Sequence, residues 1–194
     1  MKIKQEKLIK KFLIEEFEEE KGLNLYHNQI IKLNFLIENI RNKTKNQRKT
    51  LINTILPRIA LYKILEESDI DEVSSYEYVR KYMTNFVAMK KHSSMLKMEK
   101  VPGFYAIYRS IFLKIMRKTD LQKSNQEKGK NYFNVTITKC LWHTACVENG
   151  CPNLCPLFCD VDDITYGGLK KIGFSRTKTL GYGADCCDFH MFKK

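Results

Sequence analysis

The sequence predicts an α+β fold, in which a helical N-terminal region is followed by a small antiparallel sheet with short helices packed on it. Two observations lead to this prediction. Through the first 120 residues, apolar side chains recur at three- and four-residue spacing, which is typical of amphipathic helices. After residue 131 they alternate with polar side chains, which is the repeat of a half-buried strand. We expect a helical region, residues 1–120, and a Cys-rich α+β region, residues 131–194, that form one compact unit.

Five amphipathic stretches are expected to be helices. They cover residues 8–17, 30–40, 50–67, 78–86 and 104–116. The first helix is expected to stop at Gly22. Pro57 should kink or divide the third, because proline lacks an amide hydrogen and clashes with the preceding turn. Ser74 and Glu77 have the spacing of a capping box, which would open the fourth helix.

The C-terminal third is expected to hold three strands. Residues 119–131 are polar and contain glycine, so they should form a hinge before the first strand, which covers residues 133–137. Residues 171–180 and 187–192 should be two further strands, joined as a hairpin by residues 181–185. The Cys-rich segments between the first strand and this hairpin are expected to be short helices.

The charge of the chain is spread evenly. The formal net charge is +12 over 194 residues. Residues 1–100 hold 20 basic and 14 acidic side chains, and residues 101–194 hold 14 and 8, so each half is at +6. Nucleic-acid-binding proteins concentrate Lys and Arg in patches or blocks. The even distribution therefore argues against a nucleic-acid partner.

The hydropathy pattern indicates a cytoplasmic location. The charged N-terminal segment lacks the apolar run of a secretory signal, and no segment approaches the roughly 18 apolar residues of a membrane span. We therefore expect no membrane partner. In a reducing compartment cysteines seldom form stable disulfides. Catalysis, metal binding and plain burial remain as their roles.

All seven cysteines lie near the C-terminus. They are Cys140, Cys146, Cys151, Cys155, Cys159, Cys186 and Cys187. No pair has the two-residue spacing of common zinc sites, and no histidine pair accompanies them. We therefore expect neither a metal nor a cofactor.

One cysteine stands out as a candidate nucleophile. A catalytic cysteine reacts as the thiolate, so it needs a group that lowers its pKa and a nearby proton handler. Cys159 is followed by three carboxylates within four residues, and Asp163 would share its helix face. Cys187 and Asp188 repeat the pairing on an expected strand, where the two side chains would point apart. Any single cysteine could equally be a small buried hydrophobe.

Five short blocks follow one another in the C-terminal region. They are Cys140-Leu141-Trp142, Gly150-Cys151-Pro152, Leu157-Phe158-Cys159-Asp160 with Asp163, Phe174-x-Arg176-Thr177-x-Thr179-Leu180, and Gly183-x3-Cys187-Asp188-Phe189. In this order and spacing they resemble the L-2-amino-thiazoline-4-carboxylate hydrolase family. The resemblance covers residues 131–193 closely and the preceding helical region more loosely. It implies a hydrolase that opens this cyclic amidine to N-carbamoyl-cysteine.

The resemblance also implies roles for site residues. We expect Cys159 to be the nucleophile, with Asp160 or Asp163 as the proton handler. Cys187, which is followed by Asp188, is the second candidate. An alternative of a different class is a small-molecule- or metal-sensing module, whose cysteines bind a ligand without catalysis.

The expected partner is a small-molecule substrate that carries a carboxylate. A carboxylate is bound well by two parallel N–H donors, and a guanidinium provides them. Arg176 is therefore expected to bind it, together with Thr177, Thr179 and Gly183. Otherwise Asp188 on the adjoining strand should pair with Arg176. The apolar faces of the N-terminal helices are candidates for a homodimer interface.

Overall fold

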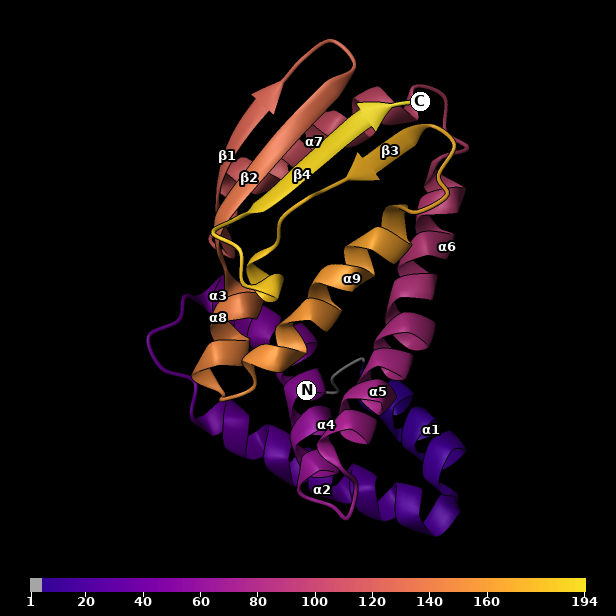
Figure 1. Cartoon of the computed structure of the whole chain (residues 1–194), viewed down its shortest axis with the longest axis vertical. Coiled ribbons are helices and arrows are strands. Elements are labelled where there is room, and N and C mark those ends of the chain that lie inside the picture. The colour runs from indigo at the N-terminus through magenta and orange to yellow at the C-terminus, as the bar shows by residue number, and fades with distance from the viewer. Residues whose placement is uncertain (1–4) are drawn as a thin grey trace. The chain divides into compact units, whose positions relative to one another are not determined.

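The computed structural model describes residues 5–194 (Figure 1). The chain divides into two compact units, residues 5–82 with 145–154 and residues 83–144 with 155–194. The predicted α+β class is confirmed, because a helical N-terminal region precedes a four-stranded antiparallel sheet that is accompanied by helices. None of the described helices combines the length and apolar character that a bilayer span requires.

The first unit is helical. Its elements are α1 (Glu6–Phe17), α2 (Glu19–Glu38), α3 (Lys45–Thr50), the π-helical turn η1 (Leu51–Ile55), α4 (Leu56–Glu66), α5 (Glu72–Tyr82), the end of α8 (Leu141–Glu148) and the 3-10 turn η3 (Pro152–Leu154). Helix α2 packs against both α1 and α4. Nine of the eleven residues of α4 are buried, so α4 is the central helix of this unit.

The first helix does not stop at Gly22, so that expectation is wrong. Helix α1 ends at Phe17, the backbone of Glu18 takes a φ of 64°, and Gly22 lies inside α2. A Cβ atom on Gly22 would lie 2.6 Å from the carbonyl oxygen of Leu13. Glycine is needed there because α1 and α2 approach closely.

Pro57 lies near a change of helix type and does not interrupt the third helical stretch, which runs without a gap from α3 through η1 into α4. The π-helical turn ends at Ile55, and Pro57 lies in the first turn of α4, where its missing amide hydrogen breaks no helical bond. The expected capping box is wrong, because α5 begins two residues before Ser74. The carboxylate of Asp71 accepts a hydrogen bond from the Ser74 amide at 3.0 Å and provides the cap.

The second unit holds the sheet. Its elements are the π-helical turn η2 (Met83–Ala88), α6 (Met89–Met98), α7 (Phe104–Lys118), β1 (Gln122–Lys128), β2 (Tyr132–Cys140), the start of α8, α9 (Cys155–Tyr166), β3 (Ile172–Ser175), the 3-10 turn η4 (Leu180–Tyr182) and β4 (Cys187–Lys193). The strand order is β1-β2-β4-β3, and all neighbouring strands are antiparallel.

Two expectations about strands are wrong. Residues 119–131 are not a hinge, because most of them form β1, which pairs along β2. Every side chain of β1 is polar or charged, and an edge strand is held by main-chain hydrogen bonds without needing apolar alternation. Strand β3 spans only Ile172–Ser175, and the connection to β4 is correspondingly longer and includes η4.

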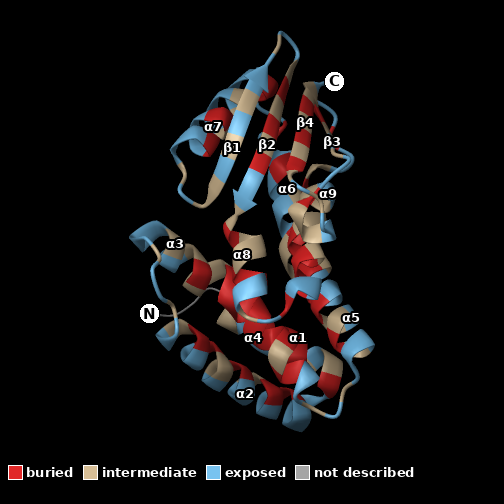
Figure 2. Ribbon diagram, turned by 60° about the vertical axis from the view of Figure 1, so that its left-hand side comes forward, coloured by how far each residue is buried: buried red, intermediate tan, exposed pale blue. Residues whose placement is uncertain are grey.

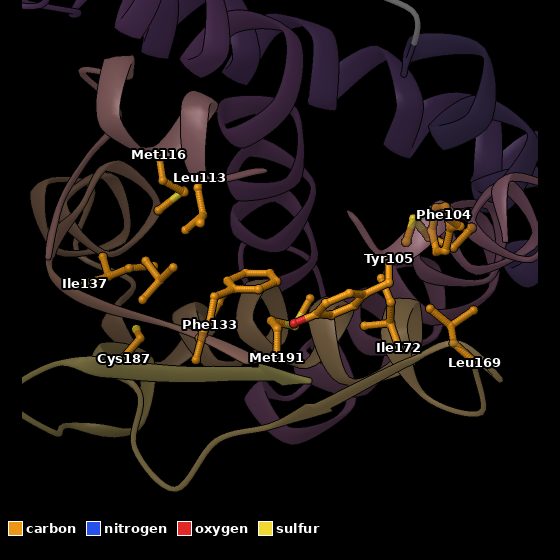
Figure 3. Packing of buried hydrophobic residues seen from close by; sticks show 13 residues of the cluster. Phe104, Tyr105, Leu113, Met116, Phe133, Ile137, Leu169, Ile172, Cys187 and Met191 are labelled. Carbon is orange, nitrogen blue, oxygen red and sulfur yellow. The ribbon is translucent and has the colours of Figure 1, made fainter. Parts of the chain in front are cut away.

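The inner face of the sheet forms the core of this unit. Buried residues alternate with half-buried ones along most of β2 and β4, as the sequence predicts (Figure 2). Phe133 and Met191 pack with Tyr105 of α7, and Cys187 and Ile137 belong to the same cluster (Figure 3). The apolar face is therefore closed by helix α7, while the polar face is turned away from it.

Candidate active site

Helix α9 carries three of the expected site residues, Cys159, Asp160 and Asp163. It packs against α6, η2, β3 and η4 within the second unit (Figure 1). Its buried apolar residues Leu157, Phe158 and Val161 occupy one side of the helix. The helical repeat places Cys155, Cys159 and Asp163 on the other side. The sequence pattern of this helix therefore separates a packing face from a face of thiols and carboxylates.

The Cys159 thiol is enclosed by three neighbours. The Thr179 hydroxyl donates a hydrogen bond to Cys159 Sγ at 3.3 Å. A Cβ atom on Gly181 would lie 2.7 Å from the same sulfur, so this position leaves room for the thiol only as glycine. A hydrogen bond with Cys155, together with burial, raises the pKa of the Cys159 thiol, and the Thr179 hydroxyl opposes that rise.

The other candidate thiol, Cys187, also has a raised pKa. Burial raises the pKa of Cys187, although the Leu180 amide, 3.4 Å from its sulfur, and the charge of Arg176 oppose the rise. Burial likewise raises the pKa of Cys140 to about 11. Burial and the neighbouring thiols therefore act against ionisation at all three cysteines, Cys140, Cys159 and Cys187.

Five of the seven free cysteines lie in the second unit, and four of these form a group. Cys140, Cys155, Cys159 and Cys187 affect one another's ionisation electrostatically. Across residues 5–194, no group of three or more Cys, His, Asp or Glu side chains has an arrangement that could hold a metal ion. Cys146 and Cys151 are buried in the helical unit.

Arg176 is buried against the carboxylates of α9. Its Nη2 donates a hydrogen bond to Asp163 Oδ2 and lies 3.8 Å from Asp160 Oδ1. The Arg176 side chain is only 7% exposed, and its buried Nη1 has no hydrogen-bond partner among the described residues. The Phe174 ring lies below the guanidinium, with 5.9 Å between the ring centroid and Cζ. Nη2 of the guanidinium is thus held by a carboxylate, and Nη1 has its hydrogen-bonding capacity unused.

Asp188 does not pair with Arg176, so that expectation is wrong. Its carboxylate accepts hydrogen bonds from the Thr177 amide at 2.9 Å, the Thr177 hydroxyl at 2.6 Å and the Lys178 amide at 2.6 Å. Burial alone would raise the pKa of Asp188, but these hydrogen bonds hold it below its usual value. Asp188 therefore fastens the segment after β3 to β4, on the opposite face from Cys187.

The turn around η4 completes the arrangement. Gly183 ends η4 with a φ of 84°, and its amide donates to the Leu180 carbonyl at 3.1 Å. This turn presents Tyr182, whose hydroxyl donates to Asp160 Oδ1 at 2.8 Å. Sequence reasoning did not find Tyr182, because its contact with α9 depends on the path of the loop.

Asp162 was also missing from the expected site residues. It interacts electrostatically with Lys91 of α6 and with Arg176. Burial raises the pKa of Asp162 to about 6, and the two positive charges only partly oppose the rise. The sequence did contain a signal for Asp162: it follows Cys159 by three residues, a spacing that places both side chains on one helix face.

The structure thus brings Cys159, Asp160, Asp163, Arg176 and Thr179 together on one side of the sheet, close to Cys187. It places Thr177 with Asp188 instead. Gly183 shapes the turn between the two groups.

The comparison with family models agrees with the resemblance in the sequence. The family model described as L-2-amino-thiazoline-4-carboxylic acid hydrolase matches residues 47–191. No curated protein matches the chain. Among solved structures, the unliganded Fe(II) H-NOX protein from K. algicida is similar at 11% identity and a TM-score of 0.37, over 100% of this chain and 97% of that one. An H-NOX domain from Shewanella oneidensis is similar at 15% identity and a TM-score of 0.36, over 96% and 97%.

Similarities this weak carry no argument about fold or function. The family match is of a different kind, because it spans most of the chain and includes all five blocks between Cys140 and Phe189. The chain belongs to the L-2-amino-thiazoline-4-carboxylic acid hydrolase family.

Proposed function

We propose that this protein hydrolyses a small cyclic amidine that bears a carboxylate, such as L-2-amino-thiazoline-4-carboxylate, with Cys159 as the nucleophile. Family membership supports hydrolysis in general. The observation that carries the finer proposal is the buried Nη1 of Arg176, which has no partner among the described residues. A buried donor left unpaired costs roughly 1–3 kcal/mol, and a substrate carboxylate would remove that cost.

The neighbours of Arg176 would orient it for this task. Asp163 and Asp160 hold Nη2, so the guanidinium keeps a fixed plane with Nη1 directed elsewhere. A carboxylate bound to Nη1 would sit beside the helix face that carries Cys159. In this proposal the two aspartates position the arginine, and Asp160 also handles protons.

The raised pKa of the Cys159 thiol fits an amidine substrate. A neutral amidine nitrogen is a base, so it can take the proton from Sγ and become an amidinium. The carbon between the ring sulfur and the two nitrogens is then electrophilic, and the thiolate adds to it. The carbon–sulfur bond of the ring breaks, the ring sulfur leaves as a thiol, and an isothiourea remains on Cys159.

Water completes the reaction. Its oxygen adds to the isothiourea carbon, and Asp160, oriented by the Tyr182 hydroxyl, accepts one proton of the water. The second proton of the water passes to the imino nitrogen as the carbonyl group forms. The bond between the carbon and Cys159 Sγ then breaks, and the thiolate recovers the proton. The product is N-carbamoyl-cysteine, which contains the substrate plus one water. The Thr179 hydroxyl would stabilise the thiolate in both half-reactions.

An assay for released thiol tests the proposal, since ring opening creates one new thiol per turnover. We expect turnover of L-2-amino-thiazoline-4-carboxylate by the unmodified chain and none by Cys159→Ser. The control is Cys186→Ser, which changes a half-exposed thiol outside the site. Mass spectrometry of the reacting enzyme should find the adduct on the peptide that contains Cys159. Full activity in Cys159→Ser would exclude Cys159 as the nucleophile.

A second candidate is a module that binds a ligand through its thiols without turning it over. The gathering of Cys140, Cys155, Cys159 and Cys187 favours it. In that case a bound small-molecule ligand should protect these cysteines together from alkylation and should be recovered unchanged. Turnover of the amidine, with these cysteines still open to alkylation, would favour the hydrolase over the binding module.

We also propose a homodimer that forms through α2. Three apolar side chains of this helix are exposed: Leu23 at 38%, Ile31 at 56% and Phe35 at 60%. They recur at multiples of four residues, so they form one stripe along the helix. A second copy of the same stripe would cover them.

The proposed chemistry needs reduced cysteines. All seven cysteines are free thiols in the structure. A reducing cytoplasm keeps thiols in this state. We therefore propose a cytoplasmic location, which fractionation of cells that express the protein would test.

A further inference from the structure

The polar face of the sheet contains a hollow that the proposed reaction does not use. In Figure 1, α7 lies behind the sheet, so the strands present their other face to the viewer. A hollow of about 460 Å³ lies on β1, β2 and β4. Its lining residues are Asn125, Gln126, Glu127, Asn134, Thr136, Asp188, Phe189 and His190. This volume is within the usual range of small-molecule sites, which is roughly 300–1,000 Å³.

A row of hydrogen bonds crosses the floor of the hollow. Glu127, Asn134 and His190 are direct neighbours on three adjacent strands. Asn134 Nδ2 donates to Glu127 Oε2 at 3.1 Å, and Asn134 Oδ1 lies 2.6 Å from His190 Nδ1. The Tyr132 hydroxyl donates to the other Glu127 oxygen at 3.2 Å. The three polar side chains are therefore held in one arrangement.

This row determines the tautomer of His190. A carboxylate only accepts, so the amide nitrogen of Asn134 must face Glu127, and its oxygen must face the imidazole. His190 Nδ1 therefore carries a hydrogen. When the ring is neutral, Nε2 has a free lone pair and can accept a hydrogen bond from a ligand.

The charge of the hollow is negative. Its lining includes the carboxylates of Glu127 and Asp188, and no Lys or Arg belongs to the described lining. The hydrogen bonds from Thr177 and Lys178 to Asp188 are made by neutral groups, so they leave the negative charge of this carboxylate in place. The Lys178 ammonium also interacts electrostatically with Asp188, but its ion pair is with Asp185, at 3.2 Å. The chain as a whole carries a net charge of +12, but the local negative charge of this lining favours a cation. Asn125 and Thr136 add neutral hydrogen-bonding groups.

We propose that this hollow is a second small-molecule site, which takes a small organic cation of the amidine class. A planar amidinium presents two parallel N–H donors, which match a carboxylate better than an ammonium does. The carboxylates of Glu127 and Asp188 supply the charge, and His190 Nε2 accepts a further N–H. The site is separate from the thiols, because Cys187 points to the opposite face of the sheet from its neighbour Asp188.

Benzamidine and benzamide are suitable probes, because they have nearly the same shape and only benzamidine is a cation. Titration of the full chain, followed by NMR of its backbone amides and of the His190 ring, should show benzamidine binding at the hollow. Benzamide should bind at least ten-fold more weakly. Glu127→Gln keeps an acceptor for the Tyr132 hydroxyl but removes the charge, so it should weaken benzamidine binding at least ten-fold. Glu38→Gln, an exposed change on α2, is the matched control.

The outcomes separate this site from the proposed hydrolase site. Benzamidine binding that survives Cys159→Ser supports an independent site, whatever the result of the turnover assay. Binding that Cys159→Ser abolishes overturns the proposal, because the cation would then occupy the thiol site. Equal affinity for benzamidine and benzamide, or unchanged affinity in Glu127→Gln, also overturns it.

Discussion

The hydroxyl of Thr179 donates a hydrogen bond to the sulfur of Cys159 across 3.3 Å, and so connects the turn before β4 to helix α9. A donor at this position stabilises a thiolate more than a thiol, and it therefore lowers the pKa of Cys159 against the effects of burial and of Cys155.

Removal of this hydroxyl should slow the reaction of Cys159. We expect Thr179→Val to lower the rate of hydrolysis by roughly 10- to 100-fold, as a lost hydrogen bond to a charged group implies. Thr179→Ser keeps the donor and should retain most of the activity. Alkylation of Cys159 as a function of pH should show a higher apparent pKa in Thr179→Val. An unchanged alkylation profile would show that the hydrogen bond does not act on the thiolate.

Exchange of the guanidinium for an ammonium should affect carboxylated substrates selectively. Arg176→Lys keeps the charge near Asp163 but loses the free Nη1, so binding of the carboxylated substrate should weaken by roughly 1–3 kcal/mol. Measurement of KM for this substrate and for 2-aminothiazoline, which lacks the carboxylate, checks the prediction. Equal losses for both substrates, with a markedly lower Tm, would assign a structural role to Arg176.

Asp162 should make stability depend on pH. Burial raises its pKa in the folded chain to about 6, from an ordinary 3.8. Below about pH 4 the carboxyl is protonated in both the folded and unfolded chains. As pH rises through 6 the folded chain must also ionise it, and the stability that the bound proton supplied is lost.

Asp162→Asn should therefore raise the free energy of unfolding at pH 8, by roughly 1–3 kcal/mol at most, and should give no gain at pH 4. Thermal melts at the two pH values check this, with the exposed Asp69→Asn as the control. An equal effect of Asp162→Asn at both pH values would contradict the assigned ionisation.

A side chain at position 181 should displace the Cys159 thiol. The Cβ of Gly181→Ala would lie 2.7 Å from Cys159 Sγ and 3.2 Å from the carbonyl carbon of Cys155. Because the sulfur moves more easily than the backbone, we expect the rate of hydrolysis to fall on the order of 10- to 100-fold. Circular dichroism should show an intact fold. Unchanged activity would mean that the thiol does not react from this position.

A charge in the exposed stripe of α2 should prevent the proposed dimer. Phe35 is 60% exposed, so Phe35→Glu should be tolerated in the monomer while it disrupts a shared apolar interface. Sedimentation velocity should show a dimer for the unmodified chain and a monomer for Phe35→Glu. Val73→Glu changes an exposed apolar residue on α5 and should remain dimeric. A monomeric unmodified chain would rule the interface out.

The sequence by itself determined the elements whose own residues carry the signal. The helical stretches and the alternation of buried residues along β2 and β4 were predictable, because each burial pattern has a local period. The five ordered blocks likewise identified the family. Strand β1 was missed because its polar side chains contain no period, and only its pairing with β2 makes it a strand.

The tertiary structure alone decided the state of each site group. Arg176 pairs with Asp163, whereas Asp188 binds Thr177. Which of the two carboxylates lies within reach of the guanidinium depends on how the chain folds after β3, and the sequence does not give those distances. The raised pKa values of Cys159 and Asp162 arise from burial and from neighbours that lie far away in the chain or on another turn of α9. Local sequence patterns determine which side chains share a face. Only packing determines the partner, and hence the charge, of each side chain.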